Sequence, residues 1–258
     1  MNTKVLSNRA LSVIDQYLHF KIGNAVCSIP YYNNKTLRVG GPLRAYKGKG
    51  SPKDIFEEVE SIIIKQHLDI NAVADESLKK LLTDNNIGID CSGFAYYVLN
   101  AENQERKKGP LDKQLSFTSC KGFMGKIVCS LRPAENCDVA TFAHKKNSNV
   151  IATNNIEPGD YISMVGGSEG ADRNHILVIH QVEYQNFIPI KLHYSHAVAY
   201  PEDGLYGTGI KQGTIEIVDL NKPITDARWI ENSNEGDTNR IHLRAKISKT
   251  EIRRLRWF

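Results

Sequence analysis

The chain has 258 residues, of which 41% are hydrophobic and 24% are charged, and its formal net charge is +4. This length can bury one sizeable core, and the apolar content with its well-mixed charges excludes a mainly disordered protein. No segment approaches the roughly 20 apolar residues that a membrane-spanning helix needs, so we expect no membrane span. The first residues lack the apolar core of a secretory signal, which predicts a cytoplasmic protein or one exported by a route other than a cleaved signal peptide.

The cysteines do not form a recognisable metal or disulfide pattern. Their number is five, and no two of them form a C-x-x-C pair, which argues against a disulfide framework and a zinc ribbon. Cys120, Cys129 and Cys137 have only His144 nearby, and we interpret them as buried or unpaired thiols. We therefore assign no metal and no cofactor.

The first third of the chain carries helical patterns. Apolar residues at helical spacing predict a helix from about Leu6 to Leu18, and residues 30–53, rich in Gly, Pro and Asn, predict a loop. A second helix should follow Ser51, because this residue can form a capping box with Asp54. The apolar stripe of that helix consists of Ile55, Val59, Ile62 and Ile63. A short helix should follow Asp75.

Residues 85–101 predict a helix that begins with a reactive cysteine. Asp90 can cap this helix, so Cys91 lies in its first turn. Unpaired backbone N–H groups and the helix dipole stabilise a thiolate at that position, which makes Cys91 the candidate nucleophile. Asp90 and Ser92 are the candidate substrate-binding residues. Their alternative roles are a helix cap at Asp90 and support of the turn at Ser92.

Strands are expected from Asp160 onward. The segments YISMV, HILVIHQVEY, IKLHYSHA and TIEIVDL are rich in β-branched and aromatic residues and are separated by turn formers. Helices followed by a run of neighbouring strands indicate an α+β domain. His175 begins one of these strands and is the candidate base that activates Cys91.

Hairpin geometry selects the residue that orients His175. If the turn lies between Gln185 and Asn186, His196 lies opposite His175 on the same face of the sheet. His193 then points to the opposite face, so His196 is the candidate orienting residue. A β-bulge or a longer loop would shift the register and give this role to His193 instead.

Four motifs resemble those of the NlpC-type papain-like cysteine peptidases over roughly residues 88–198. They are D-C-S-G-F at 90–94, P-G-D at 158–160, H-I-L-V-I-H at 175–180 and S-H-A at 195–197. The resemblance implies a papain-like α+β fold, in which the helix bearing the cysteine packs on an antiparallel sheet bearing the histidine. It implies that Cys91 is the nucleophile, His175 the base and His196 the orienting residue. It also implies cleavage of peptide or amide bonds in bacterial cell-wall peptides.

We expect one elaborated domain over the whole chain. Its expected parts are an N-terminal extension at 1–84, a catalytic core at 85–220 with an insertion at about 102–156, and a C-terminal extension at 221–258. The aromatic-glycine stretch that family members carry shortly before the cysteine has no clear counterpart. Its nearest echo is AYKGKGSP at 45–52, far upstream of Cys91.

The predicted function is that of a cysteine peptidase or amidase whose partner is a peptide or amide substrate, including peptidoglycan fragments. One alternative uses the same Cys91 and His175 chemistry for deamidation or acyl transfer on a target outside the cell wall. A second alternative is an inactive basic binding module that acts through Arg253, Arg254 and Arg256. No nucleic-acid partner is expected, because the rest of the chain shows no comparable basic stripe.

Overall fold

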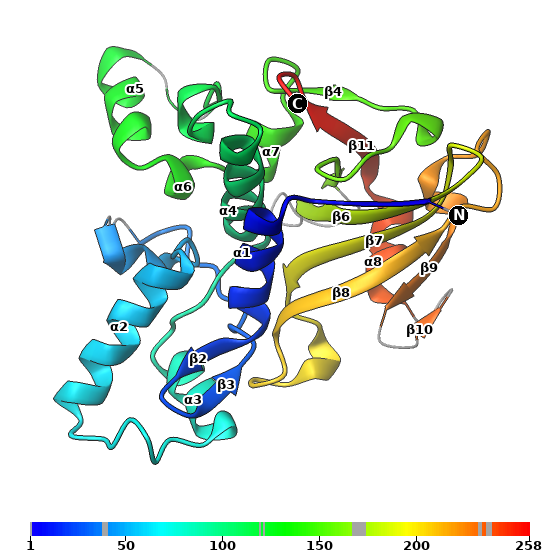
Figure 1. Ribbon diagram of the computed structural model, residues 1–258. Coiled ribbons are helices and arrows are strands. Elements are labelled where there is room, and N and C mark those ends of the chain that lie inside the picture. Colours follow the sequence, from blue (N-terminus) through cyan, green and yellow to red (C-terminus); the bar gives the residue numbers. More distant parts are fainter. Residues whose placement is uncertain are drawn as a thin grey trace.

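Helices lie on both sides of one large antiparallel sheet, so the protein has an α+β architecture (Figure 1). The computed structural model describes residues 2–37, 41–118, 120, 122–166, 174–231, 234–235 and 239–258. The strands of the sheet are β1 (Asn2–Val5), β4 (Ser148–Val150), β5 (Tyr161–Val165), β6 (His175–Gln185), β7 (Ile188–Val198), β8 (Gly209–Glu216), β9 (Arg228–Glu231), β10 (Asn234–Glu235) and β11 (Lys249–Leu255). Their order is β10-β9-β8-β7-β6-β5-β11-β4, and β1 pairs with β6.

Most helices precede the central strands in the chain. The α-helices are α1 (Asn8–Leu18), α2 (Pro52–Lys65), α3 (Asp75–Asp84), α4 (Cys91–Glu105), α5 (Gly122–Leu131), α6 (Pro133–Asn136), α7 (Val139–Ala143) and α8 (Arg240–Ile247). Short 3-10 turns are η1 (Gly41–Lys47), η2 (Leu111–Lys113), η3 (Thr153–Asn155), η4 (Pro201–Asp203) and η5 (Ile224–Asp226). A small separate hairpin consists of β2 (Phe20–Ile22) and β3 (Ala25–Cys27). The four helices predicted from the sequence correspond to α1 to α4.

The local signals predicted for α2 are confirmed. Ser51 Oγ accepts a hydrogen bond from the Asp54 amide at 3.1 Å, and the Asp54 carboxylate accepts one from the Ser51 amide at 2.8 Å. This capping box satisfies two amides that a helix start otherwise leaves unpaired. The apolar stripe is buried against the rest of the N-terminal half, and each such side chain stabilises the fold by about 1.5–3 kcal/mol.

The central strand β6 contributes to a hydrophobic core on each face of the sheet. Ile176 and Val178 pack in the core that contains α1, α2 and α4, whereas Leu177 and Ile179 pack in the core that contains α8. This division follows from the two-residue period of a strand, which points successive side chains to opposite faces. The sheet is therefore covered on both faces, and the start of β6 lies between α4 and α8.

The C-terminal segment is an integral part of the sheet. Strand β11 pairs with both β5 and β4. Arg253 is buried, Arg254 Nε lies 2.6 Å from Asp160 Oδ1, and Arg256 donates to a backbone carbonyl at 3.0 Å. The segment 221–258, expected as a C-terminal extension, thus contributes a strand between β5 and β4. Of the three arginines that the binding-module alternative uses, Arg253 is buried, Arg254 is ion-paired and Arg256 is exposed.

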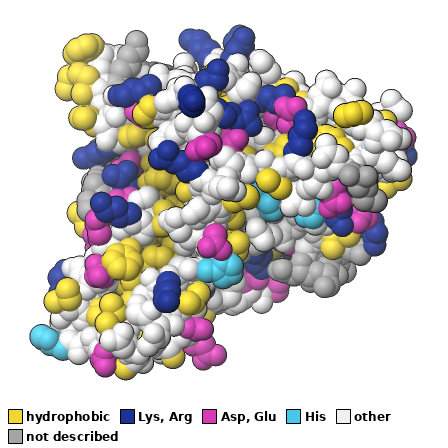
Figure 2. Space-filling model, in the orientation of Figure 1, with side chains coloured by type: hydrophobic (Ala, Val, Ile, Leu, Met, Phe, Trp, Pro, Cys, Tyr) yellow, Lys and Arg dark blue, Asp and Glu magenta, His cyan; other side chains and the backbone are white. Residues whose placement is uncertain are grey.

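The insertion between the cysteine and histidine motifs contains α5, α6, α7 and β4. Helix α5 projects from the body of the protein, and Figure 2 shows hydrophobic side chains gathered there. The exposed side chains are Phe123, Met124, Ile127, Val128 and Leu131. Cys120 and Cys129 form a disulfide, so their interpretation as unpaired thiols is wrong, whereas Cys137 is free and buried. No helix in the described part of the chain is long and apolar enough to cross a membrane.

The turn between β6 and β7 lies one residue further along than predicted. Gln185 pairs with Ile188, so the turn residues are Asn186 and Phe187, both with positive φ. Two positive φ values are typical of a type I′ hairpin turn, whose twist matches that of its strands. The error moves the strand pairing by two residues. Because this is an even number, residues paired with this offset, such as Val178 and Ser195, stay on the face that was predicted for them, whereas an irregularity between Glu183 and Tyr184 shifts the pairing of residues 181–183 by one residue more.

Candidate active site

The start of α4 places Cys91 at a helix end with free amides. Asp90 is the N-cap, and its Oδ1 accepts a hydrogen bond from the Gly93 amide at 2.6 Å. The Phe94 amide donates to the Asp90 carbonyl. Among the described residues, the amides of Cys91 and Ser92 have no hydrogen-bond acceptor. Two N–H groups beside the sulfur can therefore bind an anionic oxygen or stabilise a thiolate.

A buried lysine holds this helix start in place. Lys49 Nζ lies 2.9 Å from Asp90 Oδ1, 2.6 Å from Ser92 Oγ and 3.0 Å from the Cys137 carbonyl oxygen. Ser92 also donates to Asp90 at 3.0 Å. The side chains of Asp90 and Ser92 are thus engaged by groups of the protein itself. This geometry favours the alternative roles of helix cap and turn support, and substrate contact by either residue stays a prediction.

Sequence reasoning missed Lys49, although it lies in the AYKGKGSP echo at 45–52. The Gly48 carbonyl accepts a hydrogen bond from the Asp90 amide at 2.8 Å, so this stretch packs against the start of α4. A Cβ atom on Gly93 would lie 2.9 Å from the same carbonyl oxygen, and only glycine permits this approach. Gly48 and Gly93 were therefore sequence signals for the contact between residues 45–52 and the start of α4, although the two segments are far apart in the chain.

Two histidines and a glutamate form a buried hydrogen-bonded chain. His175 Nε2 lies 2.7 Å from His196 Nδ1, and His196 Nε2 lies 2.7 Å from Glu231 Oε2. The three residues are 2%, 0% and 4% exposed. The predicted proximity of His175 and His196 is confirmed. Glu231 was missed, although the alternation in β9 places it on the same face as the apolar Trp229 and so indicates a buried acid.

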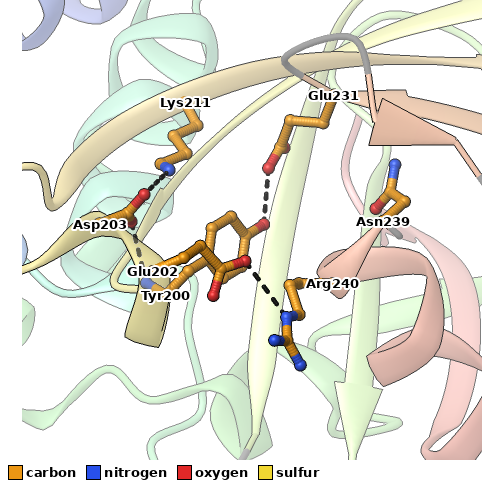
Figure 3. A pocket seen from close by; sticks show the side chains of 7 residues that line it. All are labelled: Tyr200, Glu202, Asp203, Lys211, Glu231, Asn239 and Arg240. Atoms are coloured by element: carbon orange, nitrogen blue, oxygen red, sulfur yellow. Dashed lines mark hydrogen bonds and ion pairs between the residues drawn. The ribbon is translucent and has the colours of Figure 1, made fainter. Parts of the chain in front are cut away.

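Glu231 is anchored by two tyrosines as well as by His196. The hydroxyls of Tyr194 and Tyr200 donate to its carboxylate at 3.0 Å and 2.6 Å (Figure 3 shows Tyr200). Burial raises the pKa of Glu231, but its electrostatic interaction with His196 and the hydrogen bonds from His196 and the two tyrosines outweigh burial and hold this pKa below its usual range. The carboxylate is therefore ionised and can only accept hydrogen bonds.

The ionised Glu231 decides how the protons are placed. We assign a hydrogen to His196 Nε2, which donates to the carboxylate. With His196 neutral, its Nδ1 accepts from His175 Nε2–H. The remaining ring nitrogen of His175, Nδ1, then carries a lone pair and can accept a proton. This is the tautomer that a general base requires.

Cys91 and His175 line the same cavity of about 300 Å³. Among the described residues, the sulfur makes no hydrogen bond to His175, and its carbonyl neighbour is Asn174 O at 4.0 Å. Burial, reinforced by the negative charge of Asp90, raises the pKa of the Cys91 thiol to about 11. Burial, and then the neighbouring His196, lowers the pKa of His175 well below its usual value. At rest, a neutral thiol and a neutral imidazole therefore line this cavity.

His193 lies away from this group. Its Nε2 is 2.6 Å from Glu183 Oε1, and its strand position pairs with Gln181. The predicted strand partner of His193 is Val178, whereas Val178 pairs with Ser195 in the structure. The displaced turn moves the partner of His193 by two residues, and a register irregularity between Glu183 and Tyr184 moves it by one more, to Gln181. Even so, His193 points to the face opposite His196, as predicted.

No group of three His, Cys, Asp or Glu side chains in the described ranges could hold a metal ion. Comparison of the chain with protein-family models, with curated proteins and with solved structures gives no match.

Proposed function

We propose that this chain is a cysteine hydrolase that cleaves an amide or peptide bond. Cys91 is the nucleophile, His175 the general base and His196 the residue that orients His175. The observation that carries this proposal is the buried chain from His175 through His196 to Glu231, which ends in the cavity that also contains Cys91. A histidine with a purely structural role does not require a second histidine and an ionised carboxylate behind it to fix its tautomer.

The reaction begins with the neutral pair. As the Cys91 sulfur attacks the substrate carbonyl carbon, the thiol proton passes to His175 Nδ1, a transfer that contributes about 10²–10⁴ in rate. The amides of Cys91 and Ser92 hold the oxyanion, and one such donor contributes about 10²–10³. His175 then protonates the leaving amine as the C–N bond breaks. Water, deprotonated by His175, hydrolyses the thioester and restores the thiol.

The preferred substrate class is a bacterial cell-wall peptide. Support comes from the motifs at 90–94, 158–160, 175–180 and 195–197, which resemble the NlpC-type peptidases. Deamidation or acyl transfer on another target uses the same acyl-enzyme, and differs only in which amine leaves and which nucleophile resolves the thioester.

Mass spectrometry of reaction products tests the proposal. The protein is incubated with muropeptides, with general amide substrates and with glutamine-containing peptides. We expect new peptide termini in the muropeptides, absent with Cys91→Ala and retained with Cys27→Ala. Conversion of glutamine to glutamate would instead support the deamidase alternative. Turnover that survives Cys91→Ala, or no product from any substrate with folded protein, would refute the proposal.

A further inference from the structure

We propose that Lys47 and Arg244 form a carboxylate-binding subsite in the cavity beside Cys91. If the chain is the proposed hydrolase, the subsite also implies a substrate that carries a carboxylate next to its scissile amide. This statement about the substrate rests on the proposed function. The subsite itself does not depend on hydrolysis, and it can be tested separately.

The two cations enter the cavity from different parts of the chain. Lys47 is the last residue of η1, and Arg244 lies in α8 on the other side of the sheet. Both line the cavity that contains Cys91 and His175. Neither side chain has an ion-pair partner in the described part of the chain. A partly buried cation without a partner favours an anionic ligand.

The acids of the cavity are already engaged. Asp90 is paired with Lys49 at 2.9 Å. Asp138 accepts a hydrogen bond from a backbone amide as the cap of α7. Glu135 Oε1 lies 3.9 Å from Arg44 Nε. No ion pair joins Lys47 or Arg244 to these acids in the described part of the chain, although the charges of Glu135 and Asp90 favour the charged form of Lys47.

Arg244 acts electrostatically on the reacting groups with which it shares the cavity. Its charge lowers the pKa of both Cys91 and His175, opposing burial at the first and adding to it at the second. Burial, and then the charge of Lys49, lowers the pKa of Lys47. A carboxylate would oppose the repulsion at Lys47, and it would bind the planar Arg244 guanidinium in two-point geometry. An anion held there lies in the cavity that Cys91 also lines.

The cavity also contains a buried acceptor without a partner. Among the described residues, Glu135 Oε2 has no hydrogen-bond partner, although the side chain is only 2% exposed. An unsatisfied buried carboxylate oxygen is costly and indicates a site that a ligand or water completes. A peptide with a free carboxylate supplies an anion for the two cations. The insertion contributes Glu135 to the wall of this cavity.

A pair of alkylating agents measures the subsite directly. Iodoacetate and iodoacetamide both form a thioether with the Cys91 sulfur as iodide leaves, and they differ only in a carboxylate against a carboxamide. The rate with iodoacetate is divided by the rate with iodoacetamide at Cys91, and this ratio is divided by the same ratio in urea-unfolded protein. The resulting normalised ratio reports carboxylate binding. We expect this normalised ratio to be about tenfold above one, which corresponds to about 1.4 kcal/mol.

Single charge removals then identify the residues. Arg244→Met and Lys47→Met should each lower the normalised ratio several-fold, whereas Lys246→Met, which removes an exposed cation from the same helix, should leave it unchanged. Any change in thiolate fraction affects both reagents equally and cancels in the ratio. Circular dichroism confirms folding, and Arg244→Lys provides a variant that retains the charge.

A normalised ratio near one, or an equal loss with Lys246→Met, would overturn the subsite. Matched peptides with a carboxylate or a carboxamide next to the scissile amide test the substrate class. Arg244→Met should lower kcat/KM only for the carboxylate peptide, and equal losses for both peptides would overturn this part. A raised alkylation ratio without any hydrolysis would refute the proposed function and leave the subsite standing.

Discussion

Glu231 accepts a hydrogen bond from His196 Nε2 at 2.7 Å, and both side chains are buried. Glu231 lies behind His175 and does not line the cavity with Cys91. Its carboxylate therefore acts on the proposed reaction only through His196. In the proposed mechanism, Glu231 is a positioning residue that fixes which ring nitrogen of each histidine carries the proton.

Replacing Glu231 with Gln should disturb the tautomer chain while keeping the size of the side chain. The neutral amide can donate to His196 as well as accept, so His196 can adopt the other tautomer. We expect kcat to fall roughly 10- to 100-fold, less than the ~10⁴ seen when a carboxylate directly orients the base, with KM little changed. Nitrogen NMR of the His196 ring should show the proton redistributed between its two nitrogens.

The matched control is Glu202→Gln, which removes an exposed acid seen near Glu231 in Figure 3. Turnover and the His196 ring signals should both stay at wild-type values in this control. Wild-type turnover together with an unchanged His196 tautomer in Glu231→Gln would show that the carboxylate has no positioning role.

His196→Ala should lower turnover clearly more than His193→Ala. The first change removes the hydrogen bond to His175 Nε2, whereas His193 contacts Glu183 on the other face. A buried histidine replaced by alanine can also destabilise the fold, so the free energy of unfolding is measured by urea titration alongside kcat. A greater loss with folded His193→Ala would assign the orienting role to His193.

The pH dependence of the thiolate distinguishes a neutral pair from an ion pair. Burial raises the pKa of the Cys91 thiol to about 11, so the folded protein keeps its proton until the pH approaches that value. The ultraviolet thiolate absorbance of wild type minus Cys91→Ser should stay flat from about pH 5 to about pH 9 and rise above. A thiolate plateau near neutral pH would mean that Cys91 and His175 form an ion pair at rest.

Lys49→Met should destabilise the protein markedly. Lys49 is 5% exposed and binds Asp90, Ser92 and a carbonyl oxygen, so its loss leaves a buried carboxylate without its cation. Breaking such a pair costs about 3–5 kcal/mol in the free energy of unfolding. Lys53→Met, an exposed cation nearby, should change it by less than about 0.5 kcal/mol. Equal effects in urea titrations would contradict a structural role for Lys49.

Local chemistry made part of the fold predictable. The capping box of Ser51, the cap at Asp90 and the apolar stripe of α2 depend on residues within a few positions of one another. Strand β1 and the place of β11 in the sheet were missed, because their partners lie far away in sequence and short polar strands carry little periodic signal. The hairpin turn was misplaced by one residue, since Phe187 at a positive φ is unusual.

The site was predictable where face alternation decides. His175 and His196 could be placed on one face from the strand period alone, and an even error in the turn did not change this. Glu231 and Lys49 could not be placed, because their contacts depend on how distant segments pack in three dimensions. The position of Arg244 in the cavity, without an ion-pair partner among the described residues, likewise depends on the packing of α8.

The most direct test of the central claim compares two cysteines in one molecule. Burial raises the pKa of both Cys91 and Cys27 to about 11, so neither forms a thiolate readily by itself at neutral pH. If His175 activates Cys91, iodoacetamide labelling mapped by mass spectrometry should modify Cys91 first, and His175→Ala should slow Cys91 by about 100-fold while Cys27 keeps its rate. Labelling of Cys27 before Cys91, or a Cys91 rate unchanged in folded His175→Ala, would contradict the assignment of Cys91 and His175 as nucleophile and base.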